Sequence, residues 1–253
     1  MILGVDVSLW QGTMNWQKAE AAGARFAFIR VGSINNTSGN CYADFQFANN
    51  AANCHLERGF YWYFRVNHNP LKQADFFAGL IESVPFELPP VCDFEESAGL
   101  TQAKVQSNIK AFLDRVQSRL GATPAIYTRT SIWNFSAGNP SWAGDYPLWI
   151  ARYTTIGKAP NMTGPWDDGK FKPSSWDTWE WWQFSADKPA PGNQLGKEFG
   201  SEGGSIDLNV WNRAELPPDD DSDLAQQLFE RALTAQREAL EATEALQGVL
   251  PGV

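Results

Sequence analysis

Two carboxylates stand two residues apart in a segment that otherwise has the composition of a buried strand. Residues 91–96 read VCDFEE, and they contain Asp93 and Glu95. Side chains alternate along a strand, so these two share a face at a spacing of roughly 7 Å. Two close carboxyl groups raise one another's proton affinity, so one can stay protonated while the other is ionised. Hydrolysis of a glycosidic bond requires that division of labour, although an exposed acidic loop would have the same sequence.

Two further acids lie within short apolar segments near the two ends of the first 214 residues. Asp6 lies in GVDVS at residues 4–8, and Asp207 lies in SIDLN at residues 205–209. An acid inside an apolar strand is costly unless it is paired or functional. Each is therefore either a hydrogen-bonded aspartate that ties strands together or a member of a site.

The elements that would position these acids follow from the spacing of apolar residues. Eight runs rich in β-branched and aromatic residues are predicted strands: 2–8, 26–32, 58–64, 89–95, 124–129, 147–153, 180–185 and 205–211. Helical spacing appears at 15–23, 42–54, 71–83 and 101–120, the last with Thr101 as N-cap and Gly121 as stop. Strands that alternate with helices predict a parallel sheet, and eight of them predict a closed α/β barrel. Residues 131–146 and 154–179 are predicted to be long loops, so the second half is less regular.

A closed barrel would bring the four acids together. Active sites of such barrels lie at the C-terminal ends of the strands, and Asp93 and Glu95 occupy such an end. The first and last strands are neighbours in a closed barrel, so Asp6 and Asp207 are expected beside each other.

Residues 215–253, the last 39, differ in composition from the rest. Residues 1–214 form the predicted barrel, 215–223 (ELPPDDDSD) a Pro-rich acidic linker, and 224–253 an amphipathic helix with a tail. Residues 215–253 hold nine acids and two bases, so they supply −7 of the net charge of −9. The helix at 224–247 either docks on the barrel or remains an appendage, or it mediates self-association or docking on a partner.

The composition excludes several classes of partner and cofactor. A net charge of −9 argues against nucleic acid, which needs a basic surface, and no run approaches the roughly 18 apolar residues of a membrane span. Two His and three Cys (Cys41, Cys54 and Cys92) have no metal-site spacing, so neither a metal nor another cofactor is expected. Reduced thiols are favoured, with a Cys41–Cys54 disulfide left open.

An ordered set of motifs resembles the glycoside hydrolase family 25 N-acetylmuramidases, lysozymes of the phage endolysin type. The motifs are GVDVSLWQG (4–12), FAFIR (26–30), GFYWYF (59–64), QADFF (73–77), PVCDFE (90–95), AIYT (125–128), PLWIARY (147–153), WQFS (182–185) and IDLN (206–209). They extend over about residues 2–212 in the family's order. The chain departs from the family at residues 31–34, where many members carry an acid, and at Trp62, where many have His.

The resemblance implies a modified TIM-like barrel, (β/α)5(β)3, to which the C-terminal helix would be added. It implies hydrolysis of the β-1,4 bond between N-acetylmuramic acid and N-acetylglucosamine in bacterial peptidoglycan, with retention. Glu95 matches the family's acid/base and Asp93 its assisting partner, while Asp6 and Asp207 match the remaining cleft acids. The nucleophile, either the substrate's acetamido group or a carboxylate, stays open.

Several side chains are candidate sugar contacts. Tyr61 and Tyr63 share one face of the third strand, and the resemblance places Tyr127, Trp149 and Gln183 near the sugar; core packing is the alternative for each. Arg30 ends the second strand and could orient a carboxylate or the lactyl group. Twelve Trp indicate a large core or a stacking cleft; a loop segment with Trp166, Trp176, Trp179, Trp181 and Trp182 is most simply a packed lid.

The N-terminus has no signal-peptide pattern. Synthesis in the cytoplasm and action on the cell wall are therefore expected, after release by lysis or on a phage-like particle. Two other functions remain open: a catalytically silent glycan-binding barrel, and a particle component docked through residues 224–247.

Overall fold

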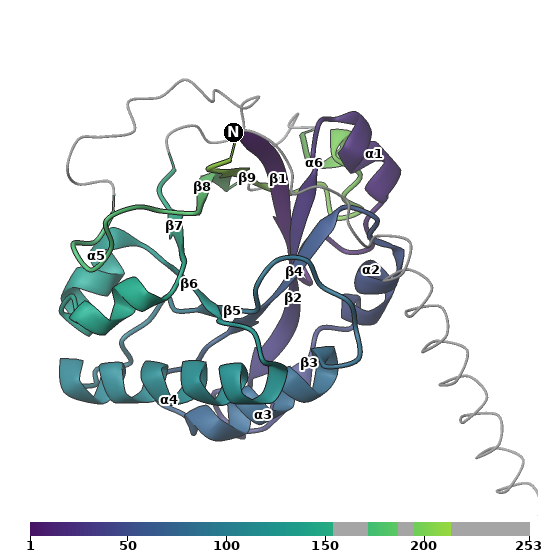
Figure 1. Cartoon of the computed structure of the whole chain (residues 1–253). Helices are drawn as coiled ribbons and strands as arrows, with labels where there is room; N and C mark the ends of the chain where they lie inside the picture. Colours follow the sequence, from purple (N-terminus) through teal and green to yellow (C-terminus); the bar gives the residue numbers. More distant parts are fainter. Residues whose placement is uncertain (154–171, 187–194, 214–253) are drawn as a thin grey trace, which may run out of the picture.

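Eight strands close into a barrel (Figure 1). The computed structural model describes residues 1–153, 172–186 and 195–213. The predicted linker at 215–223, the predicted helix at 224–247, Trp166 and most of the loop predicted at 154–179 lie outside these residues. The strands are β1 (Ile2–Val7), β2 (Phe26–Ile34), β3 (Cys41–Ala43), β4 (Glu57–Tyr63), β5 (Val91–Asp93), β6 (Ala125–Thr128), β7 (Leu148–Ala151), β8 (Trp181–Ala186) and β9 (Asp207–Trp211). The ring order is β1-β9-β8-β7-β6-β5-β4-β2, closed by pairing of β1 with β2. The predicted modified TIM-like α/β barrel is confirmed, with a strand at each of the eight expected positions.

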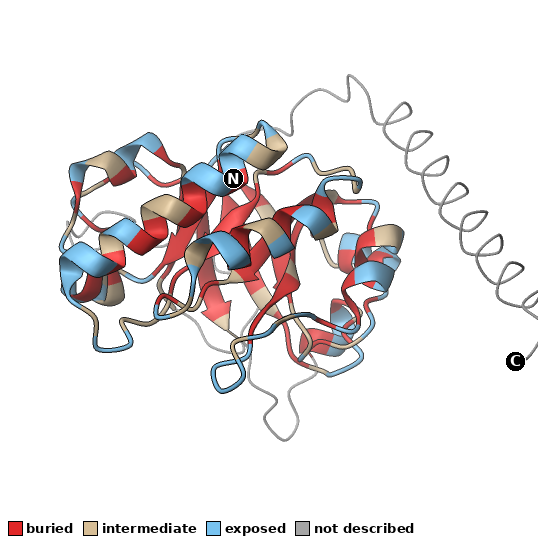
Figure 2. Cartoon of the chain, turned by 90° about the horizontal axis from the view of Figure 1, so that it is seen from below, coloured by how far each residue is buried: buried red, intermediate tan, exposed pale blue. Residues whose placement is uncertain are grey.

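Helices cover the outside of the first half of the barrel. They are α1 (Trp16–Ala21), α2 (Phe47–Asn53), α3 (Pro70–Ile81) and α4 (Gln102–Leu120), followed by short turns α5 (Thr130–Ile132), η1 (Trp133–Ala137), η2 (Ser141–Asp145) and α6 (Leu195–Glu198). At the start of α4 the Thr101 hydroxyl accepts a hydrogen bond from the Lys104 N–H, and Gly121 ends the helix at φ 68°. Figure 2 shows that these helices turn buried residues toward the strands and exposed residues outward. None of the helices in the described residues is long and apolar enough to cross a membrane.

The helix expected over 42–54 begins late, because its first residues form β3 instead. Residues Cys41–Ala43 pair antiparallel with the end of β2, and the helix begins at Phe47. The Asp44 N–H donates to the Val31 carbonyl at 2.8 Å, while the Asp44 carboxylate binds Arg30. These tertiary contacts hold the backbone extended against its helical spacing.

The last strand runs opposite to the expected direction. Strands β1 to β8 of the ring are parallel to their neighbours, but β9 is antiparallel to both β1 and β8. Ala186 at the end of β8 pairs with Asp207 at the start of β9, so the chain turns back at the same end of the barrel. The expectation of a wholly parallel sheet is therefore wrong for this strand.

Aromatic side chains fill the barrel. The interior cluster contains Phe26, Phe28, Tyr61, Tyr127, Trp149, Trp181 and Trp211. Glycine makes room for two of these rings, because a Cβ on Gly4 would lie 2.4 Å from the Phe26 ring and one on Gly59 2.6 Å from the Phe28 ring. A second cluster packs between strands and helices and contains Trp16, Trp62, Trp133, Trp176, Trp179 and Trp182. Most of the described tryptophans are therefore core residues.

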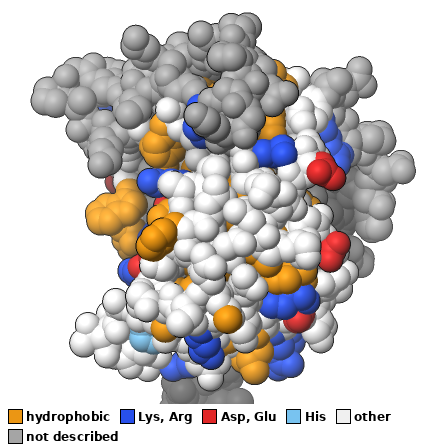
Figure 3. Space-filling view, turned by 90° about the vertical axis from the view of Figure 1, so that its left-hand side faces the viewer, with side chains coloured by type: hydrophobic (Ala, Val, Ile, Leu, Met, Phe, Trp, Pro, Cys, Tyr) orange, Lys and Arg blue, Asp and Glu red, His pale blue; other side chains and the backbone are white. Residues whose placement is uncertain are grey.

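One side of the molecule shows how little of this apolar material reaches the surface. On the face drawn in Figure 3, hydrophobic side chains form small separate groups among basic and polar ones.

Cys41, Cys54 and Cys92 are free thiols, so the Cys41–Cys54 disulfide left open above is not formed.

Candidate active site

The strand register brings the four predicted acids to one end of the barrel, the mouth. Asp6 pairs directly with Asp207 across β1 and β9. On the other side of the ring Asp93 ends β5, flanked by Tyr63 of β4 and Tyr127 of β6. Glu95 follows two residues later, and its charge acts on Asp6 as well as on Asp93. Asp207 reaches this end only because β9 is antiparallel.

Asp6 is the acceptor of a buried hydrogen-bond network. Its Oδ2 accepts from Gln183 Nε2 and from Asn209 Nδ2, both at 2.7 Å. Asn209 Oδ1 in turn accepts from Trp149 Nε1 at 2.8 Å. Burial raises the pKa of Asp6 to about 6, since it outweighs these two hydrogen bonds and the Glu95 charge acts in the same direction. Asp6 therefore ties three strands together and also carries a charge that titrates within the working range of an enzyme.

Gln183 is fixed from both ends of its amide. Its Oε1 accepts from the hydroxyl of Tyr127 at 2.7 Å and from the hydroxyl of Tyr153 at 3.0 Å. Burial raises the pKa of Tyr127 well above its ordinary value, so this phenol remains a donor. The amide nitrogen is consequently directed at Asp6.

Asp93 and Glu95 differ in their partners. Asp93 is 3% exposed, and its Oδ1 has no hydrogen-bond partner within the described residues. Burial raises the pKa of Asp93 well above its ordinary value, and the neighbouring Glu95 charge adds to this. Glu95 is less buried, and its Oε2 lies 3.1 Å from Arg129 Nη2. Burial raises the pKa of Glu95, while the Arg129 charge opposes the rise. A buried carboxyl group with an unused oxygen is costly, which is typical of a group reserved for a substrate.

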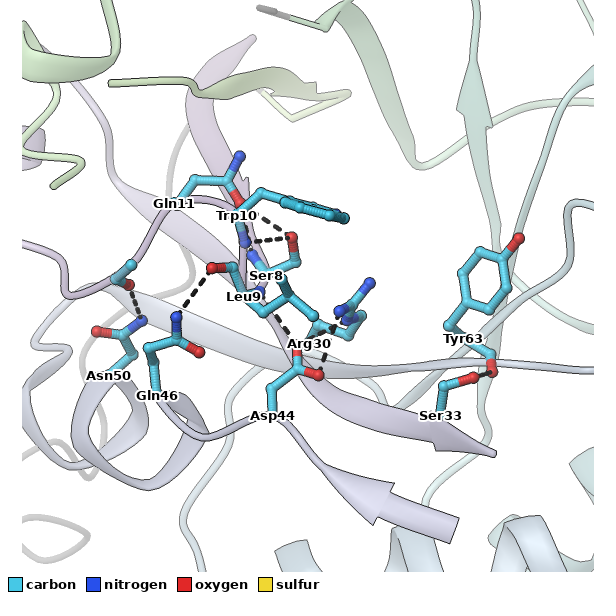
Figure 4. A network of polar contacts seen from close by, with 11 residues as sticks. Ser8, Leu9, Trp10, Gln11, Arg30, Ser33, Asp44, Gln46, Asn50 and Tyr63 are labelled. Atoms are coloured by element: carbon cyan, nitrogen blue, oxygen red, sulfur yellow. Dashed lines mark hydrogen bonds and ion pairs between the residues drawn. The ribbon is translucent and has the colours of Figure 1, made fainter. Parts of the chain in front are cut away.

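Arg30 binds the carboxylate of Asp44, which is not one of the four acids at the mouth (Figure 4). Its Nε lies 2.7 Å from Asp44 Oδ2 and its Nη2 lies 3.2 Å from Oδ1, and the Leu9 N–H also donates to Oδ2 at 3.1 Å. The Arg30 charge still lowers the pKa of both Asp93 and Glu95. It lies near the acids without contacting them.

The candidate sugar contacts lie at two depths. Tyr61 and Trp149 are buried in the barrel, with ring centroids 5.8 Å apart, and Tyr127 packs on Trp149 at 4.6 Å. Tyr63 is only partly buried, and its pKa is raised by burial and by the charges of Asp93 and Glu95. Tyr63 and Tyr127 therefore lie near enough to Asp93 and Glu95 to be affected by their charges, while the Trp149 indole donates to Asn209.

The sequence did not single out four residues that the structure places at or beside this site. Arg129, Tyr153 and Asn209 contact the acids or their partners, as the distances above show. Asn209 could have been recognised because it shares a strand face with Asp207. Trp10 is the fourth. It lies on the turn that follows the mouth end of β1, and it is 71% exposed.

The turn that carries Trp10 is held firmly. The Ser8 N–H donates to Gln11 Oε1 at 2.8 Å, and Gln46 Nε2 donates to the Leu9 carbonyl at 2.8 Å. Figure 4 shows the Trp10 ring projecting from this network toward the side on which Tyr63 lies. An exposed aromatic face on a rigid turn is suited to stacking on a sugar ring.

No three His, Cys, Asp or Glu side chains are grouped as metal ligands in the part of the chain that the structure describes. The site thus consists of carboxyl groups, phenols, amides and two guanidinium groups around a barrel mouth. Fold and site together define a glycoside hydrolase.

Comparison with known proteins identifies the family. The profile of Glycosyl hydrolases family 25 matches residues 5–193, and the chain belongs to this family. It is 32% identical over 227 residues to lysozyme M1 of Streptomyces globisporus, covering 83% of this chain and 68% of that protein. The bacterial lysozyme structure from Streptomyces coelicolor superposes with a TM-score of 0.65 at 27% identity, covering 90% of this chain and 98% of that one. A muramidase structure from Trichobolus zukalii gives 0.63 at 26% identity, with 90% and 100% covered. The predicted family and enzyme class, a lysozyme-type glycoside hydrolase, are confirmed.

Proposed function

We propose that this enzyme hydrolyses the β-1,4 bond between N-acetylmuramic acid and N-acetylglucosamine in bacterial peptidoglycan, with retention of configuration. The observation that carries this proposal is the state of Asp93 and Glu95. Both stand at the mouth end of one strand, both have raised pKa values, and Asp93 has an unused buried oxygen.

Glu95 is the proposed acid/base. In its protonated form it donates a proton to the leaving glycosidic oxygen, and in its ionised form it later accepts a proton from the attacking water. The partly exposed position of Glu95 allows both the leaving group and water to reach it.

Asp93 is the proposed assisting group. Its free Oδ1 can accept a hydrogen bond from the acetamido N–H of the substrate, which would direct the acetamido oxygen to the anomeric carbon as the C–O bond breaks. A direct attack by a carboxylate is the alternative route, and its covalent intermediate would be a glycosyl-enzyme ester.

Asp6 and Asp207 form the proposed negative floor of the site. Their charges lie at the mouth when ionised and would stabilise the oxocarbenium-like transition state. Tyr63 and Tyr127 are the proposed sugar contacts. Tyr61, Trp149 and Gln183 are proposed to hold Tyr127 and Asp6 in place. Arg30 contributes positive charge from β2.

Two alternatives are less favoured. A silent glycan-binding barrel has no need to bury Asp93 with an unused oxygen beside a second carboxyl group. A particle component docked through residues 224–247, or a phage origin, rests on the sequence pattern alone. Truncation after residue 214 that leaves particle mass and wall targeting unchanged would remove the docking hypothesis.

The proposal is tested by measuring reducing ends released from purified peptidoglycan. We expect Glu95→Gln to abolish release, while Glu96→Gln retains it, because Glu96 is paired with Arg65 at 2.6 Å. Glu95→Gln that cleaves as fast as the parent would overturn the assignment. Proton NMR of the first products should show the β-anomer; initial release of the α-anomer would contradict retention.

A further inference from the structure

Arg129 has three contacts at the mouth that the mechanism above does not use. It follows β6 directly, two residues after Tyr127, and its Nη2 lies 3.1 Å from Glu95 Oε2. The same Nη2 donates to the Tyr153 hydroxyl at 3.3 Å. The guanidinium carbon also lies 5.2 Å from the centroid of the Tyr153 ring, within the range of a cation–π contact. Arg129 is therefore positioned from two sides.

The hydroxyl of Tyr153 connects this cation to the floor of the site. It accepts from Arg129 and donates its one proton to Gln183 Oε1 at 3.0 Å. Gln183 in turn donates to Asp6 at 2.7 Å. A continuous path thus leads from Glu95 through Arg129, Tyr153 and Gln183 to Asp6.

Eight charged or titratable groups act on Glu95, and they lie on six strands or on the segments that follow those strands. The carboxyl groups are Asp6 of β1, Asp93 of β5 and the adjacent Glu96; the cations are Arg30 of β2 and Arg129; the phenols are Tyr63 of β4, Tyr127 of β6 and Tyr153. The carboxyl groups favour a protonated Glu95, and the two cations favour an ionised one. Arg30 is engaged with Asp44, so Arg129 is the cation that contacts Glu95 directly among the described residues.

These opposing charges act on Glu95, which must change its protonation state in each catalytic cycle. The first half of the reaction needs Glu95 protonated, and the second half needs it ionised. The burial of Glu95 and the neighbouring carboxyl groups assist the first half. The Arg129 charge lowers the pKa of Glu95 against the effect of burial, and so it assists the second half.

We propose that Arg129 is a positioning residue of this enzyme: held by Tyr153, it orients Glu95 and sets the upper pH limit of catalysis. The inference rests on the proposed acid/base role of Glu95. Without the guanidinium, Glu95 keeps its proton to higher pH, so the alkaline limb of the pH profile moves upward and the second half-reaction loses its base.

The test compares pH profiles of kcat/KM on purified peptidoglycan at constant ionic strength. For Arg129→Met we expect the alkaline limb to move up by about half to one pH unit, the range for a partly exposed ion pair. Arg129→Lys keeps the charge and should leave the limb within about a quarter of a unit of the parent. Tyr153→Phe keeps the ring but removes the hydroxyl, so we expect a shift smaller than that of Arg129→Met.

Arg213→Met is the matched control. Arg213 pairs with Glu180 at 3.1 Å and stacks on Trp211 at 4.7 Å, with similar exposure, but at the opposite end of the barrel. We expect its pH profile to equal that of the parent. An unshifted limb in Arg129→Met, or an equal shift in the Lys and control variants, would overturn the inference. Activity remaining in Glu95→Gln would instead overturn the proposed function, so the two failures are distinguishable.

Discussion

Asp6 and Asp207 lie directly opposite each other across β1 and β9, although they come from the first and last strands of the barrel. The pairing exists because β9 runs antiparallel to its neighbours. Its first residue, rather than its last, therefore stands at the mouth. A parallel last strand would place Asp207 at the far end, away from Asp93 and Glu95.

The ionised form of Asp6 is predicted to lower the stability of the folded protein at neutral pH. Its pKa of about 6 in the folded protein exceeds the ordinary value of 3.8, so folding favours the protonated form. The folded state is therefore favoured fully below about pH 4, and that contribution is lost as the pH rises through about 6.

We expect Asp6→Asn to raise the free energy of unfolding at pH 7 by on the order of 1–3 kcal/mol relative to the parent. The asparagine oxygen can still accept from Gln183 and Asn209. The gain should vanish near pH 4, and activity should fall at least about tenfold. Urea unfolding at pH 4 and pH 7 measures this; equal stability differences at both pH values would contradict it.

Asp93 is predicted to act on the chemical step. Asp93→Asn retains the shape but replaces one carboxyl oxygen with an amide NH2, so it removes the ionisable group and one of the two acceptor oxygens proposed to face the acetamido group. We expect kcat to fall by about 10²–10³-fold with KM changed little. Asp75→Asn is the control, because Asp75 pairs with Arg115 and Arg119 on α3 and α4, away from the mouth. A main effect on KM would mean that Asp93 only binds substrate.

Trp10 is predicted to bind the glycan strand. Loss of its exposed ring in Trp10→Ala should raise KM on peptidoglycan by about tenfold, while Trp10→Phe retains most of the binding. Phe76→Ala removes a 36% exposed ring from the middle of α3 and should leave KM unchanged. Equal effects of the two alanine variants would show that the Trp10 ring has no special role.

Gly4 is predicted to be required for the barrel interior. An added Cβ would lie 2.4 Å from the Phe26 ring, so Gly4→Ala should lower the free energy of unfolding by about 1–3 kcal/mol. Gly79 lies in α3 with nothing within 4 Å of an added Cβ, so Gly79→Ala should raise it by about 0.5–1 kcal/mol. Thermal unfolding of both variants tests this opposite sign.

The sequence predicts what local signals determine. The strand positions follow from apolar runs, and α4 follows from helical spacing between Thr101 and Gly121. The direction of β9 depends on its pairing with β1, at the other end of the chain, and the late start of α2 depends on the pairing of β3 with the end of β2. The pattern of a single strand or helix contains no signal for such pairing.

The candidate site is predictable to a similar extent. The four acids could be found because carboxyl groups in apolar strands are unusual. The pairing of Arg30 with Asp44 and the contact of Arg129 with Glu95 could not be predicted. Each depends on at least one side chain that lies beyond a strand end, in a segment whose course the sequence leaves undetermined.

The central claim is the bond that is cleaved. Mass spectrometry of muropeptides after complete digestion of purified peptidoglycan identifies the sugar at each new reducing end. The account predicts muramic acid there with the parent enzyme and no product with Glu95→Gln. Glucosamine at the new reducing end, or products with Glu95→Gln, would contradict it.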